Sequence, residues 1–239
     1  MKVLGRNIVA ATLALGWLVT SAHAYEAGSV SNGGSISGKV KFQGTAPARK
    51  ALEVTKDKEV CGAHQIMNED LVVSSDGGLE NAVVSITSIS KGKAFDAAAP
   101  VLDQKGCVYI PHVLLSPAGA TIKINNDDGI LHNIHTYSTK NPPINRAQPK
   151  FKKTMDEKFD QPEVIKVTCD AHGWMQGWLV VQDHPYYAKT DSTGAFKLTD
   201  VPPGDYELKV WHGKLGEKTQ KITVPAGGAA TANFELAAK

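Results

Sequence analysis

The chain has 239 residues, and its 26 Lys and Arg residues nearly balance its 24 Asp and Glu residues. This balance disfavours a nucleic-acid-binding protein, which would carry a strongly basic surface. The length allows one large domain or two small ones, and no long run of one charge sign marks a tail.

The first 24 residues have the composition of a secretory signal peptide. Lys2 and Arg6 precede the apolar run 8–20, and the small residues of Ser-Ala-His-Ala follow at 21–24. The run is shorter than the roughly 20 residues of a comfortable membrane span, so we expect cleavage after Ala24; an uncleaved anchor is the alternative. Removing this segment leaves 24 basic and 24 acidic residues and no apolar stretch of spanning length. The sequence predicts a periplasmic or secreted protein without a membrane span in its mature chain.

Alternation of apolar and polar residues predicts β-strands along most of the mature chain. The expected strands are 35–42, 79–89, 108–115, 120–125, 131–137, 163–168 and 178–182. No stretch is a convincing amphipathic helix, and 151–159 is the best weak candidate. Residues 46–69 and 138–162 are expected to be long loops, which are usually functional or contain structure that the pattern misses.

The pattern becomes more regular after His184. Residues 190–211 alternate cleanly around turns at Gly194 and at 202–204, and two more strands are expected at 221–224 and 230–236. The segment T-D-x-x-G-x-F-x-L-x-x-V-P-P-G-x-Y-x-L resembles the carboxypeptidase regulatory-like (transthyretin-like) sandwich. That resemblance implies a small antiparallel β-sandwich and no catalytic role.

The simplest domain division places a metal domain at 25–183 and the small sandwich at 184–239. A second arrangement stays open, because 37–44 and 79–84 also resemble the opening strands of the carboxypeptidase-like module. In that arrangement the metal domain is inserted between strands of the module.

Three cysteines in an exported chain leave one thiol without a partner. The simplest pairing is Cys61 with Cys107, which leaves Cys169 for another use. Two alternatives stay open. Cys61 and His64 could join Cys107 and His112 in a zinc-like Cys2His2 set, or Cys61 and Cys107 could be inert thiols.

Cys169, His172 and Met175 form a C-x2-H-x2-M group between two expected strands. A thiolate, an imidazole and a thioether suit copper in both oxidation states. His132, 37 residues before Cys169, can supply a second imidazole from another strand. We therefore expect one Cu(I)/Cu(II) ion in a His2Cys site with a long axial Met; a packed turn with a buried thiol is the alternative.

The same residues resemble the cupredoxin motif. Residues 119–133 fit G-x-T-x-x-x-x-N-x-D followed by H-N, and the spacing in 169–175 is the short-loop form of amicyanin. The resemblance covers about 105–182, including Tyr-Ile-Pro at 109–111, and implies an all-β Greek-key sandwich. It implies that His132, Cys169 and His172 are equatorial ligands and that Met175 is the axial ligand. It also implies that Asn133 tethers the loop that carries the cysteine.

The implied function is one-electron transfer with a redox partner of unknown identity. Electrons would pass through an exposed edge of His172, with Trp174 in an apolar docking rim and Trp178 packed in the core. No open coordination position is implied, so we do not expect an enzyme. A copper-binding or delivery protein of the cell envelope and a purely structural sandwich protein are the rival functions.

The remaining histidines have weaker claims on a metal. His135 should point away from the copper ion, because alternate residues of a strand face opposite sides. His112 is expected to be structural or at the surface, with a second metal site as the alternative. His184 and His212 are expected to be surface or packing residues.

Overall fold

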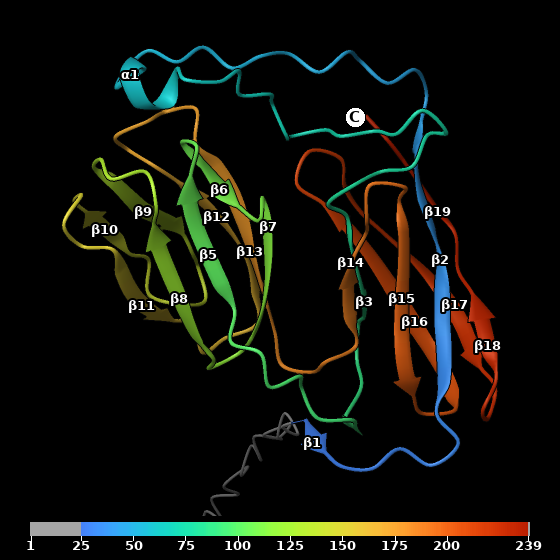
Figure 1. Cartoon of the computed structure of the whole chain (residues 1–239). Helices are drawn as coiled ribbons and strands as arrows, with labels where there is room; N and C mark the ends of the chain where they lie inside the picture. Colours follow the sequence, from blue (N-terminus) through green and yellow to red (C-terminus); the bar gives the residue numbers. More distant parts are fainter. Residues whose placement is uncertain (1–24, 239) are drawn as a thin grey trace, which may run out of the picture.

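The computed structural model describes residues 25–238, so the predicted signal peptide lies outside the described residues. Two β-sandwiches lie side by side (Figure 1), and the prediction of an all-β fold is confirmed. The elements are β1 (Glu26–Ala27), β2 (Gly34–Gln43), α1 (Lys58–Cys61), β3 (Val83–Ile86), β4 (Lys91–Gly92), β5 (Val101–Lys105), β6 (Val108–Ile110), β7 (Val113–Pro117), β8 (Thr121–Asn126), β9 (His132–Tyr137), β10 (Asn145–Gln148), β11 (Thr154–Lys158), β12 (Glu163–Thr168), β13 (Gln176–Gln182), β14 (Tyr187–Lys189), β15 (Ala195–Val201), β16 (Gly204–His212), β17 (Gly216–Val224), β18 (Ala229–Thr231) and β19 (Phe234–Ala237). Within 25–238, no helix has the length and apolar character needed to cross a membrane.

The first sandwich carries the predicted metal ligands. Its two sheets have the strand orders β10-β9-β12-β13-β7 and β11-β8-β5-β6. Alternate residues of these strands point into the space between the sheets, where Ile124, Ile165 and Leu179 are buried in one apolar core. The β9, β12 and β13 strands are neighbours in one sheet, which brings the two predicted ligand segments to the same end of the sandwich.

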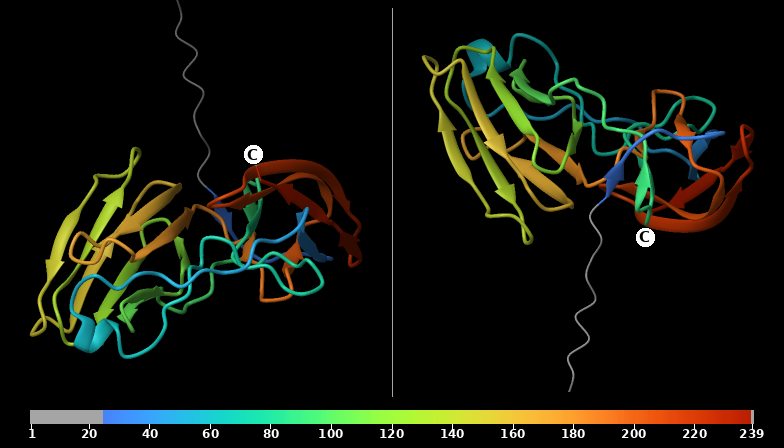
Figure 2. Two further views of the ribbon diagram at one scale, coloured as in Figure 1. Left: turned by 90° about the horizontal axis from the view of Figure 1, so that it is seen from above. Right: turned by 90° about the horizontal axis from the view of Figure 1, so that it is seen from below.

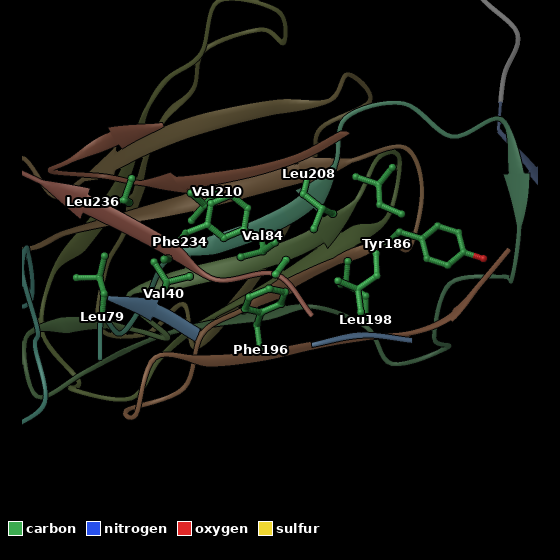
Figure 3. Close-up of a cluster of buried hydrophobic side chains, with 14 of the residues drawn as sticks. Val40, Leu79, Val84, Tyr186, Phe196, Leu198, Leu208, Val210, Phe234 and Leu236 are labelled. Carbon is green, nitrogen blue, oxygen red and sulfur yellow. The ribbon is translucent and has the colours of Figure 1, made fainter. Parts of the chain in front are cut away.

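The second sandwich combines C-terminal strands with two strands from much earlier in the chain. Its sheets have the orders β14-β3-β16-β17 and β15-β2-β18, with β19 also paired to β2. Its core contains Val40 and Val84 from these early strands beside Phe196, Leu208 and Phe234 (Figure 3). The core is therefore complete only when β2 and β3 are included.

This pairing is the interleaved arrangement, and it differs from a division at residue 183. After β2 the chain leaves the second sandwich, and it returns there to form β3. It then forms the first sandwich with β5 to β13 and re-enters the second sandwich at β14. The expected antiparallel pairing holds for β15 with β2, but β18 and β19 both pair in parallel with β2. That sheet is therefore mixed.

Residues 46–69, which we call the arm, connect the two sandwiches in an unexpected way. The arm runs from the end of β2 to α1 at the end of the first sandwich and then back (Figures 1 and 2). Its outgoing and returning halves are joined by backbone hydrogen bonds from Leu52 to Ile66 and from Asn68 to Lys50. Ile66 and Cys61 are buried in the core of the first sandwich, so the arm is an integral part of that sandwich.

Two other segments differ from the sequence-based expectations. Residues 151–159 are not a helix: β11 occupies 154–158 and pairs antiparallel with β8, and Met155 is buried in the core. The expected strand 108–115 is divided into β6 and β7 around the cis peptide bond between Ile110 and Pro111.

A small apolar cluster joins the two sandwiches. Val83 comes from the second sandwich, and Val113 and Val180 come from the first. Beside them, the rings of Trp178 and Trp211 lie 5.0 Å apart in a T-shaped contact, a geometry that aromatic pairs favour. The packing role expected for Trp178 is thus confirmed, at the junction between the sandwiches.

Candidate metal centre

The structure brings the four predicted ligand residues to one end of the first sandwich. His132 is the first residue of β9, while Cys169, His172 and Met175 lie in the loop between β12 and β13. All four side chains are buried, with exposed fractions of at most 1%. Polar groups buried to this degree need hydrogen-bond or metal partners.

Three donor atoms from these residues form a compact triangle. The Nδ1 atoms of His132 and His172 are 3.0 Å apart, and the Cys169 Sγ atom lies 4.0 Å and 3.8 Å from them. A point equidistant from the three atoms lies about 2.1 Å from each. Zinc, an ion of similar size to copper, binds His nitrogen and Cys sulfur at about 2.0–2.3 Å. The residues therefore fit one metal ion of the size of copper, and their donor types favour copper.

The ligand loop is closed by its own backbone. The Cys169 N–H donates to the Met175 carbonyl at 3.2 Å, and the Met175 N–H donates to the His172 carbonyl at 2.9 Å. Met175 shares the apolar cluster that contains Cys169. These bonds hold the thioether-bearing residue beside the thiol-bearing one.

Asn133 tethers the loop from the neighbouring strand, as expected. Its Oδ1 atom accepts a hydrogen bond from the Asp170 N–H, and its carbonyl accepts one from the Tyr109 hydroxyl at 2.6 Å. Asn133 follows His132 and Asp170 follows Cys169, so the hydrogen bond between them ties the two predicted ligand segments together.

Each of the two predicted ligand histidines also contacts a carboxylate. The Nε2 atom of His132 lies 2.8 Å from Asp128 Oδ2, and the Nε2 atom of His172 lies 2.8 Å from Asp57 Oδ2. A carboxylate on the far nitrogen fixes which ring nitrogen is free to bind a metal. Both rings therefore direct Nδ1 toward Cys169.

Neither carboxylate is among the residues that the sequence predicts at the site. Asp128 precedes His132 by four residues and is the last residue of the cupredoxin-like motif, so its position held a usable signal. Asp57 is 115 residues from His172 and lies in the arm. No local pattern connects it to the metal site.

The surroundings shift the pKa values of the donor groups. Burial raises the pKa of Cys169, but hydrogen bonds from His132 and from backbone N–H groups outweigh this and lower it overall. Burial alone would lower the pKa of His132, but Asp128 and Cys169 raise it to about 9. Burial lowers the pKa of His172 despite the contact with Asp57. The lowered pKa of Cys169 favours the thiolate, which is the form that binds metals.

The predicted disulfide is confirmed, and Cys169 is the free cysteine. The bond joins Cys61 of α1 to Cys107 of the turn between β5 and β6. The alternative zinc-like Cys2His2 set with His64 and His112 is therefore wrong, because the sulfur atoms of both cysteines are bonded to each other. A disulfide favours an oxidising compartment outside the cytoplasm.

The expected exposed edge of His172 is not observed. The His172 side chain is fully buried, and Asp57 covers its Nε2 atom. Trp174 is also partly buried; its ring centroid lies 5.0 Å from that of His172, and its indole N–H donates to the Cys107 carbonyl at 3.1 Å. The predicted exposure of the His172 edge is wrong because Asp57 of the arm lies against the Nε2 atom of that ring.

The other histidines lie away from the triangle of donor atoms. His135 points to the opposite face of β9 and contacts Asp170 at 2.9 Å, as predicted. His112, His184 and His212 are buried packing residues rather than surface residues.

One of these buried histidines, His212, should make the fold sensitive to acid. Burial and the neighbouring His112 lower the pKa of His212 to about 4. The unfolded chain takes up this proton near pH 6.5, so stability is complete above pH 6.5 and falls as the pH decreases toward 4. At pH 4 and below, the shift corresponds to a loss of about 3 kcal/mol.

The His212→Asn variant provides the matched comparison. Asparagine does not titrate, and its Oδ1 atom, placed like Nδ1 of histidine, can still accept the hydrogen bond that the Lys214 N–H donates to His212 Nδ1. Urea unfolding at pH 7 and pH 4.5 should show a smaller acid loss in the variant than in the wild type. Equal losses in the two proteins would show that His212 does not contribute.

Comparison with known proteins gives one family match and several similar folds. Residues 179–237 match the family "Carboxypeptidase regulatory-like domain", which confirms that part of the prediction. No curated protein matches the chain.

The solved structures with similarity to the chain include a purple cupredoxin, amicyanin and a copper-containing nitrite reductase. A purple cupredoxin from Nitrosopumilus maritimus is 24% identical over 36% of this chain and 100% of its own, with a TM-score of 0.30. An oxidised proline-to-glycine mutant of amicyanin is 24% identical over 41% of this chain and 98% of its own, with a TM-score of 0.32. A copper-containing nitrite reductase from Thermus scotoductus is 19% identical over 41% of this chain and 25% of its own, with a TM-score of 0.33. The chain thus contains a carboxypeptidase regulatory-like domain, and its similar solved structures include cupredoxins.

Proposed function

We propose that this protein is an exported one-electron carrier that holds a single copper ion in a type 1 site. The observation that carries the proposal is the buried triangle of His132 Nδ1, His172 Nδ1 and Cys169 Sγ, with edges of 3.0, 3.8 and 4.0 Å. Met175 is the proposed axial ligand. The motif resemblance to cupredoxins supports the same ligand set.

Copper bound there would supply reversible one-electron exchange between its Cu(II) and Cu(I) states. The role of the protein is to bind and orient. His132 and His172 present Nδ1 because their Nε2 atoms face carboxylates, and Cys169 supplies a thiolate. Their burial excludes bulk water from the donor atoms.

The protein itself holds the donor atoms in place. Hydrogen bonds within the loop of Cys169, His172 and Met175, together with the tether from Asn133, hold them at the end of the first sandwich. A preassembled site needs little rearrangement on a change of charge, which suits electron transfer. We propose no substrate position at this site, and hence no enzymatic activity.

The proposed location is the periplasm or the extracellular space. The Cys61–Cys107 disulfide favours an oxidising compartment, and residues 1–24 have the composition of a signal peptide. A copper-loaded carrier there would exchange electrons with a partner protein, and the near-neutral charge of the chain gives no reason to expect nucleic acid as a partner.

Voltammetry of the purified, copper-loaded protein tests electron transfer against metal storage or delivery. We expect a reversible one-electron wave that disappears when copper is removed and returns when it is restored. A protein that binds copper tightly but shows no reversible wave would be a storage or delivery protein. A protein that binds no copper would contradict both functions.

A further inference from the structure

The arm brings an acidic side chain to a ligand histidine from a distant part of the chain. Asp57 Oδ2 lies 2.8 Å from His172 Nε2, and the two residues are 115 positions apart. The His172 side chain is fully buried, while that of Asp57 is 37% exposed. The Asp57 carboxylate therefore lies between the imidazole and solvent.

The backbone of Asp57 is arranged for this contact. Its φ of 48° and ψ of 44° place it in the left-handed region, immediately before α1. Its carbonyl accepts hydrogen bonds from the N–H groups of Val60 and Cys61, at 3.0 and 2.9 Å. This turn fixes the direction of the side chain, and Asp is among the few residues that adopt the conformation readily.

The disulfide fastens this turn to the other side of the metal site. Cys61 ends α1, and its partner Cys107 donates its backbone N–H to Asp128 Oδ2 at 2.8 Å. Asp128 Oδ2 also contacts the Nε2 atom of His132. One covalent bond therefore joins the segment that holds His172 to the segment that holds His132.

We propose that the arm is a cover over the His172 side of the copper site, held by the Cys61–Cys107 disulfide, and that Asp57 is a positioning residue for His172. This inference rests on the proposed copper site. Asp57 would keep the proton of His172 on Nε2, leaving Nδ1 free for the metal, and the arm would slow access of external reagents to the site. Electrons reaching His172 from outside would cross the arm rather than a bare imidazole edge.

Two substitutions of Asp57 separate its carboxylate from its backbone conformation. Asp57→Gly removes the side chain and keeps the left-handed backbone accessible. Asp57→Asn retains a side-chain oxygen that can accept the Nε2 proton, and Asn also tolerates this conformation. Asp200→Gly is the control, because Asp200 is exposed, has a φ of 55° and lies in the second sandwich.

The first measurement needs no metal. Nitrogen-15 NMR of the histidine-labelled, metal-free protein, with the His172 signals assigned through His172→Gln, reports which ring nitrogen carries the proton. We expect the Nε2–H form in the wild type, in Asp57→Asn and in Asp200→Gly, and a mixture of both forms in Asp57→Gly. A mixture in the wild type would overturn the positioning role.

The second measurement is the rate of copper release from the Cu(I)-loaded proteins to a Cu(I) chelator. Loss of a residue that orients a metal ligand typically weakens metal binding about 10–100-fold, and we expect release from Asp57→Gly to accelerate by that factor. Asp57→Asn and Asp200→Gly should release copper at the wild-type rate. Equal rates in Asp57→Gly and the wild type would overturn the proposal. If the wild-type protein does not bind copper, the proposed function is refuted. The NMR measurement on the metal-free protein would still decide the role of Asp57.

Discussion

Replacing Cys169 with Ser is expected to abolish the intense visible absorption of the Cu(II)-loaded protein. The band arises from charge transfer between the thiolate and copper, and Cys169 is the only free cysteine among the described residues. We also expect the affinity for Cu(I) to decrease by more than about 100-fold, because loss of an outer orienting residue alone costs about 10–100-fold. Optical titration with Cu(II) and competition with a Cu(I) chelator measure the two effects.

The control for this variant is His135→Gln. His135 lies on the same strand as His132 but faces Asp170 on the opposite side, so its replacement should leave the band intact. Survival of the band in Cys169→Ser would exclude Cys169 as a ligand. Loss of the band in His135→Gln with the fold intact would show that the site extends to the other face of β9.

Removing the disulfide is expected to produce the largest loss of stability. The bond closes a loop with a sequence separation of 46 residues, and the chain-entropy relation for a loop of that length gives about 4 kcal/mol. Both cysteines are fully buried, so Cys61→Ala with Cys107→Ala is preferred to serine, which would bury unpaired hydroxyl groups.

Urea unfolding of the double variant measures this loss. Alkylation of the unreduced wild type, followed by mass spectrometry, should label neither Cys61 nor Cys107. A stability loss below about 1 kcal/mol would contradict the entropic role that is typical of native disulfides. The stability of the second sandwich provides an internal control, because its core contains neither cysteine.

Local patterns in the sequence group Cys169, His172 and Met175, and the structure places these three side chains in one buried loop. The spacing of Cys169, His172 and Met175 is fixed within one short loop, so the sequence alone shows that these side chains come from one place. A motif on a neighbouring strand points to His132, and strand alternation predicts that His135 lies on the other face. These inferences depend on short-range geometry, which sequence reports directly.

Contacts between distant segments were not predictable in the same way. The arm has no hydrophobic period of its own; its conformation depends on the disulfide and on packing of Cys61 and Ile66 into the first sandwich. The contact between Asp57 and His172 follows from that packing. The expectation that His172 would be exposed therefore failed where a non-local segment covered the site.

The boundary between the two domains and the weak helix candidate also depend on contacts between distant segments rather than on local patterns. The similarity of 37–44 and 79–84 to a sandwich module was visible in the sequence, but only the pairing of β2 with β15 and of β3 with β16 shows where those strands lie. Residues 151–159 were too short for periodicity to distinguish helix from strand. Pairing of β11 with β8 determines their conformation.

The absorption spectrum of the purified wild-type protein during titration with Cu(II) tests the copper site most directly. We expect an intense visible band that grows linearly and reaches its maximum at one equivalent of copper. A protein that stays colourless through the titration, with its fold and its disulfide intact, would contradict the proposal that His132, Cys169, His172 and Met175 form a type 1 copper site.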